Sequence, residues 1–368
     1  MRDVDALAHS RSKEELEAEL ASALAVCGDG ECRREALNAF KDRETFRVDM
    51  RHIQGHIAEF GQFAAELSDV AEVVVQAAAQ LCYDELVVSF GIPLQEDGQP
   101  CPMSVCALGK FGGRELGYAS DIELMFLFAG NGQTAGPRVI STAEFYERLV
   151  RAFLQTIHAK REGIFEIDLR LRPYGRAGSM AVSMASFRHY FAPDGPAWAY
   201  ERQALTRLRP VAGDVVLGEA IIAARDELLY NGKLFDVAAM RAMRERQLRH
   251  LVTAGTLNAK FSMGGLVDVE YLVQALQMQY GHLDVRLRAT NTQEAMAALA
   301  AAGILSPEDY RHLREAHIFL RRLIDALRVV RGNARDLTVP PVQSAEFEFL
   351  ARRLGYGEEA MRLYQDLG

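Results

Sequence analysis

The chain has 368 residues, of which 49% are hydrophobic and 25% are charged. These values are ordinary for a globular protein, so they exclude wholesale disorder, and the length allows two or three domains. The formal net charge of −8 argues against a broad nucleic-acid-binding surface, which requires a basic face. No run of about 18 apolar residues without charge predicts a membrane span, and the charged N-terminus lacks the apolar region of a signal peptide.

Five cysteines are present, and neither close pair has the CxxC spacing of a typical metal site. They are Cys27, Cys32, Cys82, Cys101 and Cys106. An odd number of cysteines in a chain of this length does not fit a disulfide-stapled scaffold. We therefore expect reduced thiols in a cytoplasmic protein without membrane association.

Helices are predicted in the first part of the chain. Apolar residues recur every three to four positions within residues 13–26, 34–53 and 69–90. Residues 91–102, GIPLQEDGQPCP, are rich in Gly and Pro and predict a loop. We therefore expect residues 1–90 to form an N-terminal helical segment.

Short strands are predicted next, beginning with the apolar run MSVCALG at residues 103–109. A turn with a short helix is expected at 112–120, a second strand, DIELMFLF, at 121–128, a helix at 142–159 and a third strand, IFEIDLRLRP, at 164–173. Pro173 ends the third strand because proline cannot donate a hydrogen bond to a ladder. This order predicts an α+β fold, with a small mixed sheet and helical cover in a core at residues 91–212.

The chain is expected to be helical again from Ser183 onward. The predicted helices fall within residues 214–230, 237–255, 266–281, 292–303 and 306–332. Ser306 suits the N-cap of the last helix, and Pro307 suits its first turn. We therefore expect residues 213–368 to form a C-terminal helical domain.

Charged residues alternate with apolar ones in two of the predicted strands. Because successive side chains of a strand point to opposite faces, Asp121 and Glu123 share one face. By the same argument, Asp168 shares a face with Arg170 and Arg172. Adjacent strands would therefore bring three carboxylates and two guanidinium groups to one edge of the sheet.

A cluster of three carboxylates indicates a site for divalent cations. Packed carboxylates repel each other and raise one another's pKa values. Mg2+ removes this penalty because it prefers oxygen ligands. Two such ions about 4 Å apart can hold a triphosphate, activate an attacking hydroxyl and stabilise the leaving oxygen. The pattern thus favours phosphoryl or nucleotidyl transfer, which depends mainly on positioning and charge neutralisation.

Gly112 and Gly113 fit a phosphate-binding turn. Their backbone can approach an anion closely, and a short helix after them would direct N–H groups at a phosphate. Lys110 is placed to add a positive charge. A Walker A loop is excluded because GKFGGRELG lacks the G-x-x-x-x-G-K-[ST] spacing. A dinucleotide-binding fold is excluded because G-x-G-x-x-G and repeated βαβ units are missing.

The segment LGKFGGRELGYASDIELMFLF resembles the signature of the glutamine synthetase adenylyltransferase/adenylyl-removing enzymes, members of the DNA polymerase β-like nucleotidyltransferase superfamily. The resemblance continues in EIDLRLRPYGRAGSMAVS, WAYERQALTRLRPVAGD, KFSMGGLVDVEYLVQ and AHIFLRRLIDALR. It covers residues 33–340, and several motifs in one order argue against chance similarity.

This resemblance implies an Mg2+-dependent enzyme that transfers AMP from ATP to a tyrosine of glutamine synthetase, or removes it with phosphate to give ADP. It implies nitrogen regulation, with glutamine synthetase and a PII-type signalling protein as partners. Asp121 and Glu123 would bind a pair of Mg2+ ions, with Asp168 as third ligand or general base. The nucleotide-binding residues would be Lys110, Gly112, Gly113, Ser120, Arg170 and Arg172. For the two arginines, an ion pair with Asp168 or neighbouring acids is an equal alternative.

The sequence departs from the family pattern in two ways. The family usually has Asp at the position of Glu123, whose longer side chain changes the ligand geometry. The family enzyme is a tandem of two related halves, whereas this chain shows one Gly-Gly…D-x-E site and resembles one half. RPYGRAGS and the FLRRL helix are more similar to the N-terminal, AMP-removing half, but both halves carry the site motif. The open alternatives are another acceptor, such as a PII-type protein, and a catalytically silent module that binds nucleotide or a regulator.

Overall fold

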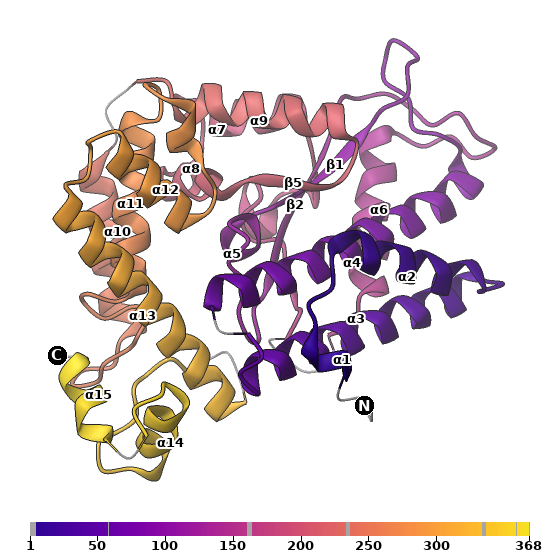
Figure 1. Cartoon of the computed structure of the whole chain (residues 1–368). Helices are drawn as coiled ribbons and strands as arrows, with labels where there is room; N and C mark the ends of the chain where they lie inside the picture. The colour runs from indigo at the N-terminus through magenta and orange to yellow at the C-terminus, as the bar shows by residue number, and fades with distance from the viewer. Residues whose placement is uncertain are drawn as a thin grey trace. The chain divides into compact units, whose positions relative to one another are not determined.

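The computed structural model describes residues 5–57, 59–159, 164–232, 236–332, 336–357 and 359–367 (Figure 1). The chain divides into two compact units. The first comprises Met1–Leu116, Asp121–Arg161 and Phe165–Asn231, and the second includes Gly117–Ser120 and Gly232–Gly368. The N-terminal helices and the sheet therefore share one unit, while the division at residues 90 and 212 stays a prediction.

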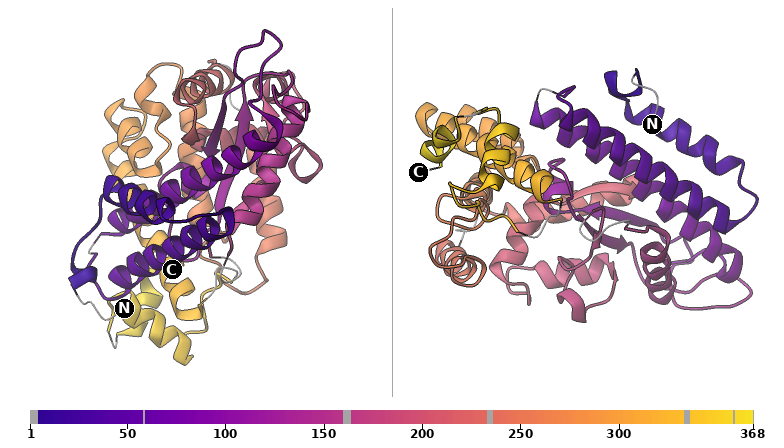
Figure 2. Two further views of the ribbon diagram at one scale, coloured as in Figure 1. Left: turned by 90° about the vertical axis from the view of Figure 1, so that its right-hand side faces the viewer. Right: turned by 90° about the horizontal axis from the view of Figure 1, so that it is seen from below.

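Among the described residues of the first unit, four helices precede the sheet. They are α1 (Asp5–Ala8), α2 (Lys13–Ala25), α3 (Gly30–Ile53) and α4 (Phe60–Phe90). Ser12 begins α2 with a capping box to Glu15, and the side chain of Asp29 caps α3. The long helices α3 and α4 lie side by side (Figure 2), and α4 also packs against β5 and α6. These contacts make α4 the central core helix of this unit.

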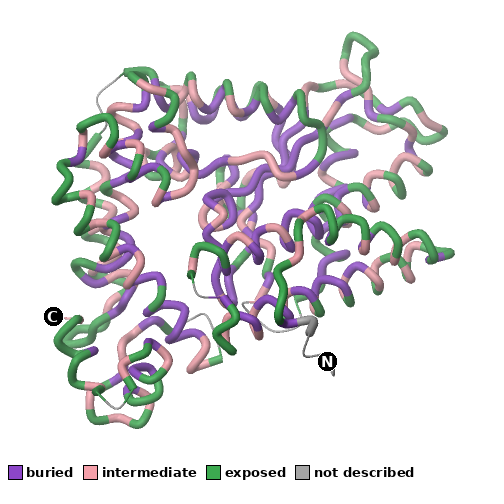
Figure 3. Tube along the Cα trace, viewed as in Figure 1, coloured by how far each residue is buried: buried purple, intermediate pink, exposed green. Residues whose placement is uncertain are grey.

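The sheet is small and mixed, as the sequence predicts. Its strands are β1 (Met103–Ala107), β2 (Ile122–Phe128), β3 (Ile167–Asp168), β4 (Ala181–Ser183) and β5 (Arg209–Gly213). The order is β3-β2-β1-β5, and β4 also pairs with β2. β1 is antiparallel to β2 and β5, whereas β2 is parallel to β3 and β4. Strands β1 and β2 are buried along nearly their whole length (Figure 3).

The other helices of the first unit cover this sheet. They are α5 (Gly109–Gly112), α6 (Thr142–Thr156), α7 (Met184–Phe191), α8 (Ala199–Ala204) and α9 (Val215–Leu229), with short 3-10 turns at Gly175–Ala177 and Leu205–Arg207. Helix α6 packs against α4 and β4, and α9 packs against β5 and β1. The predicted α+β class is therefore confirmed, with helices covering a five-stranded sheet.

Three strand predictions are wrong in extent or missing. The strand predicted at residues 164–173 is only two residues long, because the chain turns after Asp168 into the segment before η1 (Gly175–Ala177). Strand β5 lies in the region from Ser183 onward that was expected to be helical, and β4, which ends at Ser183, was not predicted. Their periodicity is hidden because each is short and β5 carries Pro210.

Helix α4 is, within the described residues, the one long and apolar enough to cross a membrane by length and composition alone. It nevertheless carries two buried carboxylates that pair with other helices and strands. Glu66 pairs with Arg51 of α3, and Glu72 pairs with Lys13 and Arg209. Such internal ion pairs and packing are typical of a core helix of a globular unit.

The second unit is helical among its described residues. Its helices are α10 (Val237–Leu251), α11 (Leu266–Tyr280), α12 (Thr292–Ala301), α13 (Pro307–Arg331), α14 (Ala345–Arg353) and α15 (Ala360–Asp366), with a 3-10 turn, η3, at Val285–Arg288. Ser306 caps α13, Pro307 lies in its first turn and Gly332 ends it in the left-handed conformation, so the predicted capping is confirmed. Its core includes Leu266, Met296 and Leu323.

The cysteines differ in part from the prediction. Cys27 and Cys32 form a disulfide with a Cα–Cα distance of 5.4 Å, so reduced thiols are the wrong expectation for this pair. The pair closes the short connection between α2 and α3, where the chain brings the two residues together. Cys82, Cys101 and Cys106 are free and buried. Burial raises the pKa of the Cys106 thiol to about 12, so it stays protonated at neutral pH.

Candidate active site

Two carboxylates lie opposite each other on neighbouring strands. In the parallel ladder between β2 and β3, Glu123 is the partner of Asp168, and Ile122 is the partner of Ile167. Paired residues of neighbouring strands project to the same face, so Glu123 and Asp168 share a face at this edge of the sheet. Asp121 lies two residues before Glu123, just ahead of β2, and it is exposed. The strand adjacency on which the predicted carboxylate cluster depends is therefore present.

Asp168 is held by an ion pair. The Nε atom of Arg170 lies 2.7 Å from one carboxylate oxygen of Asp168, and the backbone N–H of Arg170 donates to the other at 2.8 Å. Burial opposes ionisation of Asp168, but the hydrogen bonds and charge of Arg170 outweigh it and lower the pKa of this carboxyl. Asp168 is therefore an ionised carboxylate and a weak proton acceptor at neutral pH.

The other two carboxylates also affect the pKa of Arg170. The side chain of Arg170 is 62% exposed, while that of Asp168 is only 12% exposed. The pKa of Arg170 is raised, first by Asp168 and in smaller part by the charges of Asp121 and Glu123. One exposed cation thus lies within the field of all three predicted metal ligands. The ion-pair alternative for Arg170 is the arrangement that the structure contains.

Glu123 lies against a glycine that was absent from the predicted site. A Cβ atom on Gly109 would fall 1.5 Å from Oε2 of Glu123. Gly109 also has a φ of +51°, in the left-handed region that favours glycine. The backbone N–H of Leu108 donates to the carbonyl of Glu123 at 2.9 Å, which keeps the two segments together. Gly109 therefore makes the space that the Glu123 carboxylate fills.

The Gly-Gly turn ends a helix instead of preceding one. Helix α5 runs from Gly109 to Gly112, and Gly113 is its C-cap. The carbonyl end of the helix therefore faces the turn, and the predicted helix-dipole attraction for a phosphate at this position is wrong. Arg209 of β5 donates to the carbonyls of Phe111 and Gly112 at 3.1 and 3.0 Å, which satisfies this negative end.

Close packing explains the need for glycine at position 112. A Cβ atom there would lie 1.8 Å from the carbonyl oxygen of Arg207. Arg207 is buried and pairs with Glu115 at 3.2 Å. The RLRP segment, which contains Arg207 and Arg209, thus packs against the Gly-Gly turn. No spacing rule in the sequence predicts this contact.

A buried carboxylate on α4 anchors the same turn. Glu72 is 3% exposed and forms ion pairs with Lys13, Arg114 and Arg209 at distances of 2.7 to 2.8 Å. Arg114, the residue after Gly113, has a φ of +54° and also pairs with Asp69. Burial opposes the ionisation of Glu72, yet the charge of Arg209 and the neighbouring Lys13 and Arg114 lower its pKa. This Glu72 cluster fixes the Gly-Gly turn to the core helix.

Three other predicted nucleotide-binding residues, Lys110, Ser120 and Arg172, make hydrogen bonds within the chain. Lys110 lies half-buried in α5, where its carbonyl accepts from the N–H of Glu115. The Ser120 hydroxyl accepts from the N–H of Gly117 at 3.0 Å. Arg172 lies beyond β3, is buried, and donates to the carbonyl of Leu169 at 2.7 Å. The alternation argument for Arg172 is therefore wrong, because the strand has already ended.

The donor set fits Mg2+ by its chemistry. Asp121, Glu123 and Asp168 offer carboxylate oxygens, the ligands that Mg2+ prefers. Within the described part of the chain, they do not form a group whose ligand atoms all lie within 4.8 Å of one another. Asp168 instead holds Arg170. A metal that binds all three carboxylates must therefore draw them together and displace that guanidinium.

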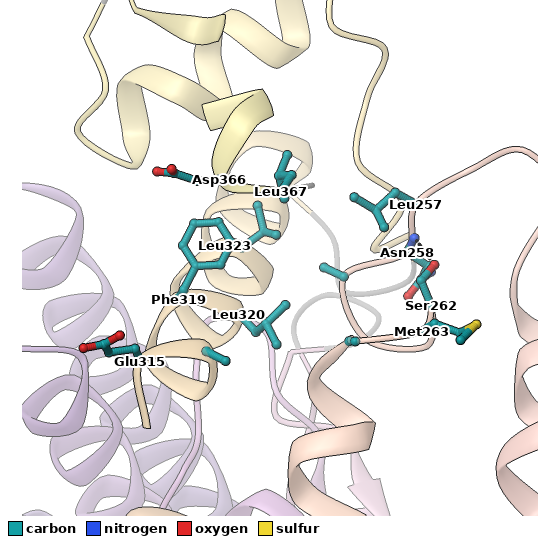
Figure 4. Close-up of a pocket in the computed structure, with 14 residues that line it drawn as sticks. Leu257, Asn258, Ser262, Met263, Glu315, Phe319, Leu320, Leu323, Asp366 and Leu367 are labelled. Atoms are coloured by element: carbon teal, nitrogen blue, oxygen red, sulfur yellow. Dashed lines mark hydrogen bonds between the residues drawn. The ribbon is translucent and has the colours of Figure 1, made fainter. Parts of the chain in front are cut away.

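A pocket of about 650 Å³ lies in the second unit, apart from these carboxylates in the sequence (Figure 4). Leu257, Met263, Phe319, Leu320 and Leu323 supply much of its apolar lining, and Asn258 and Ser262 lie at its wall. Both polar side chains accept backbone N–H groups of their own loop. None of the predicted site residues lines this pocket.

Comparison with known proteins identifies similarity over most of the chain. Residues 1–224 match the glutamate-ammonia ligase adenylyltransferase family. A bifunctional glutamine synthetase adenylyltransferase/adenylyl-removing enzyme of Stenotrophomonas maltophilia is 33% identical over 85% of this chain and 34% of the relative. Enzymes of the same name from Hahella chejuensis and Aromatoleum aromaticum are 34% and 31% identical over 79% and 93% of this chain, covering 31% and 38% of the relatives.

Two features of these matches concern domain content. The chain spans about a third of the length of the curated relatives it matches. Residues 238–367, which form most of the second unit, match a different family, the PII-uridylyltransferases. The sheet with its carboxylates and the helical second unit therefore match separate families.

Proposed function

Because this chain belongs to the glutamate-ammonia ligase adenylyltransferase family, we propose that it is a metal-dependent nucleotidyltransferase acting on a tyrosine of glutamine synthetase. The observation that carries the proposal is the register that sets Glu123 opposite Asp168, with Asp121 two residues ahead. Three carboxylates at one sheet edge suit a pair of Mg2+ ions. The reaction is AMP transfer from ATP, or AMP removal with phosphate to give ADP.

The carboxylates hold the metal ions in this mechanism. Asp121, Glu123 and Asp168 would supply the oxygen ligands, and bound Mg2+ would neutralise the phosphate charge and polarise the reacting phosphorus centre. The lowered pKa of Asp168 favours its role as a charged ligand over that of a strong general base. Gly109 keeps the Glu123 carboxylate in its place at the strand edge.

The cationic and turn residues bind the nucleotide in this proposal. Arg170 would give up its pairing with Asp168 when the carboxylate binds metal and would pair with a phosphate oxygen, which its exposure allows. Lys110 and Gly113 lie at the helix α5 turn beside β2 and contact the remaining phosphates. For Gly112, Ser120 and Arg172, a nucleotide contact rests on the family resemblance alone, beside the structural contacts described above.

In the removal reaction, a phosphate oxygen forms a bond to the phosphorus of tyrosyl-AMP, and the bond from phosphorus to the tyrosine oxygen breaks. The products are ADP and tyrosine, whose oxygen takes up a proton. In the transfer reaction, the tyrosine oxygen attacks the α-phosphorus of ATP, loses its proton and releases pyrophosphate. Both reactions need the same charge neutralisation at one phosphorus centre.

The test incubates the purified chain with adenylylated glutamine synthetase, phosphate and Mg2+, and separately with unmodified glutamine synthetase, ATP and Mg2+. Mass spectrometry of the tyrosine peptide reads loss or gain of AMP, and chromatography reads ADP or pyrophosphate. We expect one reaction to proceed and to stop on addition of a chelator. Neither reaction with the wild-type chain, under conditions in which a full-length relative is active, would refute the proposal.

The match of residues 238–367 to the PII-uridylyltransferases favours a second candidate function. In that case the acceptor is a PII-type protein, which in the first proposal is a regulator. Incubation of the chain with a PII-type protein and either UTP or ATP distinguishes the two, because only an acceptor gains nucleotide mass. A catalytically silent binding module predicts nucleotide binding without either product. Because the proposed substrate is a cytoplasmic protein, we also propose a cytoplasmic location for this chain.

A further inference from the structure

We propose that Asp325 and Arg328 of α13 are positioning residues for the carboxylate site, because they hold the loop that delivers Asp121. This inference rests on the proposed metal-binding role of Asp121. The loop, Gly117–Ser120, belongs to the second compact unit together with α13, whereas Asp121 follows it directly in the chain and begins the return to the first unit. The sequence motif GGRELGYASDIE thus passes through both units.

The two side chains form hydrogen bonds with both backbone polar groups of Tyr118. The backbone N–H of Tyr118 donates to Oδ1 of Asp325 at 3.0 Å. The Nη1 atom of Arg328 donates to the carbonyl of Tyr118 at 3.0 Å and to the hydroxyl of Ser120 at 3.3 Å. Residues three apart on a helix lie on the same face, so α13 presents a matched acceptor and donor to the loop.

The loop conformation requires such support. Ala119 has a φ of +53°, a left-handed conformation that costs a residue with a Cβ atom roughly 1 kcal/mol or more. Ala119 and Ser120 are buried at 5% and 7% exposure. The Ser120 hydroxyl accepts from the N–H of Gly117 as well as from Arg328, which closes the turn on itself.

Burying two charged side chains costs free energy, so this pair is poorly suited to a role in stability alone. Asp325 and Arg328 are 4% and 7% exposed, and charges removed from water cost free energy that apolar side chains of α13 would not. Neighbouring positions of the same helix, Leu323 and Leu327, are apolar and belong to the core of the second unit. Charged groups at 325 and 328 instead give directional bonds to the backbone of Tyr118 and to the hydroxyl of Ser120, the residue before Asp121.

The direction of these bonds has a consequence for catalysis. Tyr118 is three residues before Asp121, so a shift of its peptide planes moves the start of β2 and the exposed Asp121 carboxylate. Metal sites tolerate little displacement, and a misplacement of about 1 Å costs roughly a hundred-fold in rate. Loss of these bonds would therefore reach the Asp121 carboxylate along the chain, through Ala119 and Ser120.

The test compares three substitutions in the whole chain. Asp325→Ala removes the acceptor for Tyr118, and Asp325→Asn keeps an oxygen acceptor at the same place. Leu327→Ala weakens the core of the second unit and leaves the hydrogen bonds of Asp325 and Arg328 to the loop in place. Mn2+ affinity, kcat, KM and thermal midpoint are measured for each. We expect Asp325→Ala to weaken Mn2+ binding and lower kcat roughly ten- to a hundred-fold, and Asp325→Asn to restore most of both.

Leu327→Ala should lower the thermal midpoint while Mn2+ affinity and kcat of the folded protein stay near wild type. Arg328→Met gives a second variant, for use if Asp325→Ala does not fold, and it should resemble Asp325→Ala. Equal effects of Leu327→Ala and Asp325→Ala on kcat, in proportion to lost stability, would overturn the positioning role. An inactive wild-type chain that also binds no Mn2+ would instead refute the proposed function, so the two failures are distinguishable.

Discussion

Gly109 lies so close to Glu123 that a methyl group on it would fall 1.5 Å from a carboxylate oxygen. The glycine sits at the start of α5 with a φ of +51°, and the carboxylate projects from β2. A strand residue and a turn residue fourteen positions apart therefore define one small volume. The position of the Glu123 carboxylate is thus set by the missing side chain of Gly109.

Gly109→Ala should displace Glu123 and lower kcat/KM roughly a hundred-fold, because the carboxylate must move by more than a bond length. The matched control is Gly98→Ala. Gly98 also has a positive φ, +79°, but a Cβ atom there would meet nothing within 4 Å. Both variants carry backbone strain, and only the first should lose Mn2+ affinity. Equal Mn2+ affinity in the two variants would contradict this role of Gly109.

Arg170→Gln should strengthen metal binding at neutral pH, because Asp168 no longer pairs with a guanidinium. It should also move the acidic loss of Mn2+ binding to higher pH. Arg170 lowers the pKa of Asp168 against the opposing effect of burial, so without Arg170 the carboxyl protonates at a higher pH. Titration of Mn2+ binding against pH measures the shift.

Arg148→Gln is the control for that experiment, since Arg148 is an exposed arginine of α6 that pairs with Glu144. It should leave the pH profile of Mn2+ binding unchanged. An Arg170→Gln profile that overlays the wild-type profile would show that the ion pair does not govern Asp168.

Asp121→Asn should abolish Mn2+ binding, or weaken it at least ten-fold, because a neutral amide replaces an exposed anionic ligand. Glu96→Gln, an exposed change in the loop before β1, removes the same charge from the chain and should bind Mn2+ like wild type. Isothermal titration gives the affinities directly and does not depend on the acceptor protein. Unchanged affinity in Asp121→Asn would exclude Asp121 from the metal site.

Glu72→Gln should destabilise the first unit by about 3 kcal/mol, because three cations lose a buried carboxylate partner. The pKa of Glu72 is lower in the folded chain than in the unfolded one. Its contribution is therefore full above the unfolded pKa of about 4.3 and is lost as pH falls through the lower folded value.

Thermal midpoints measured from about pH 2 to about pH 8 test this pH dependence, because the range spans the unfolded carboxyl pKa of about 4.3. The difference between wild type and Glu72→Gln should be constant near neutrality and shrink below about pH 4. Glu144→Gln, which breaks an exposed i,i+4 pair on α6, should cost about 0.5 kcal/mol or less. A pH-independent difference for Glu72→Gln would contradict ionisation of this carboxylate.

The sequence by itself determined the long helices and the two central strands, and its alternation predicts that Asp121 and Glu123 share one face. These features follow from local periodicity, which each segment carries alone. The start of α13 is also marked locally, by the capping residues Ser306 and Pro307. The carboxylate pair at the strand edge follows once β2 and β3 are neighbours.

Only the tertiary structure decided how those residues are supported. Gly109 makes room for Glu123, fourteen positions away, while Glu72 and Arg209 hold the Gly-Gly turn from segments far from it in the chain, and no spacing rule connects these residues. The dipole orientation at Gly112 depended on where the four-residue helix α5 begins, which propensity cannot resolve over so few residues. Asp325 meets the Tyr118 loop across 207 positions, because folding brings together groups whose separation along the chain carries no local signal.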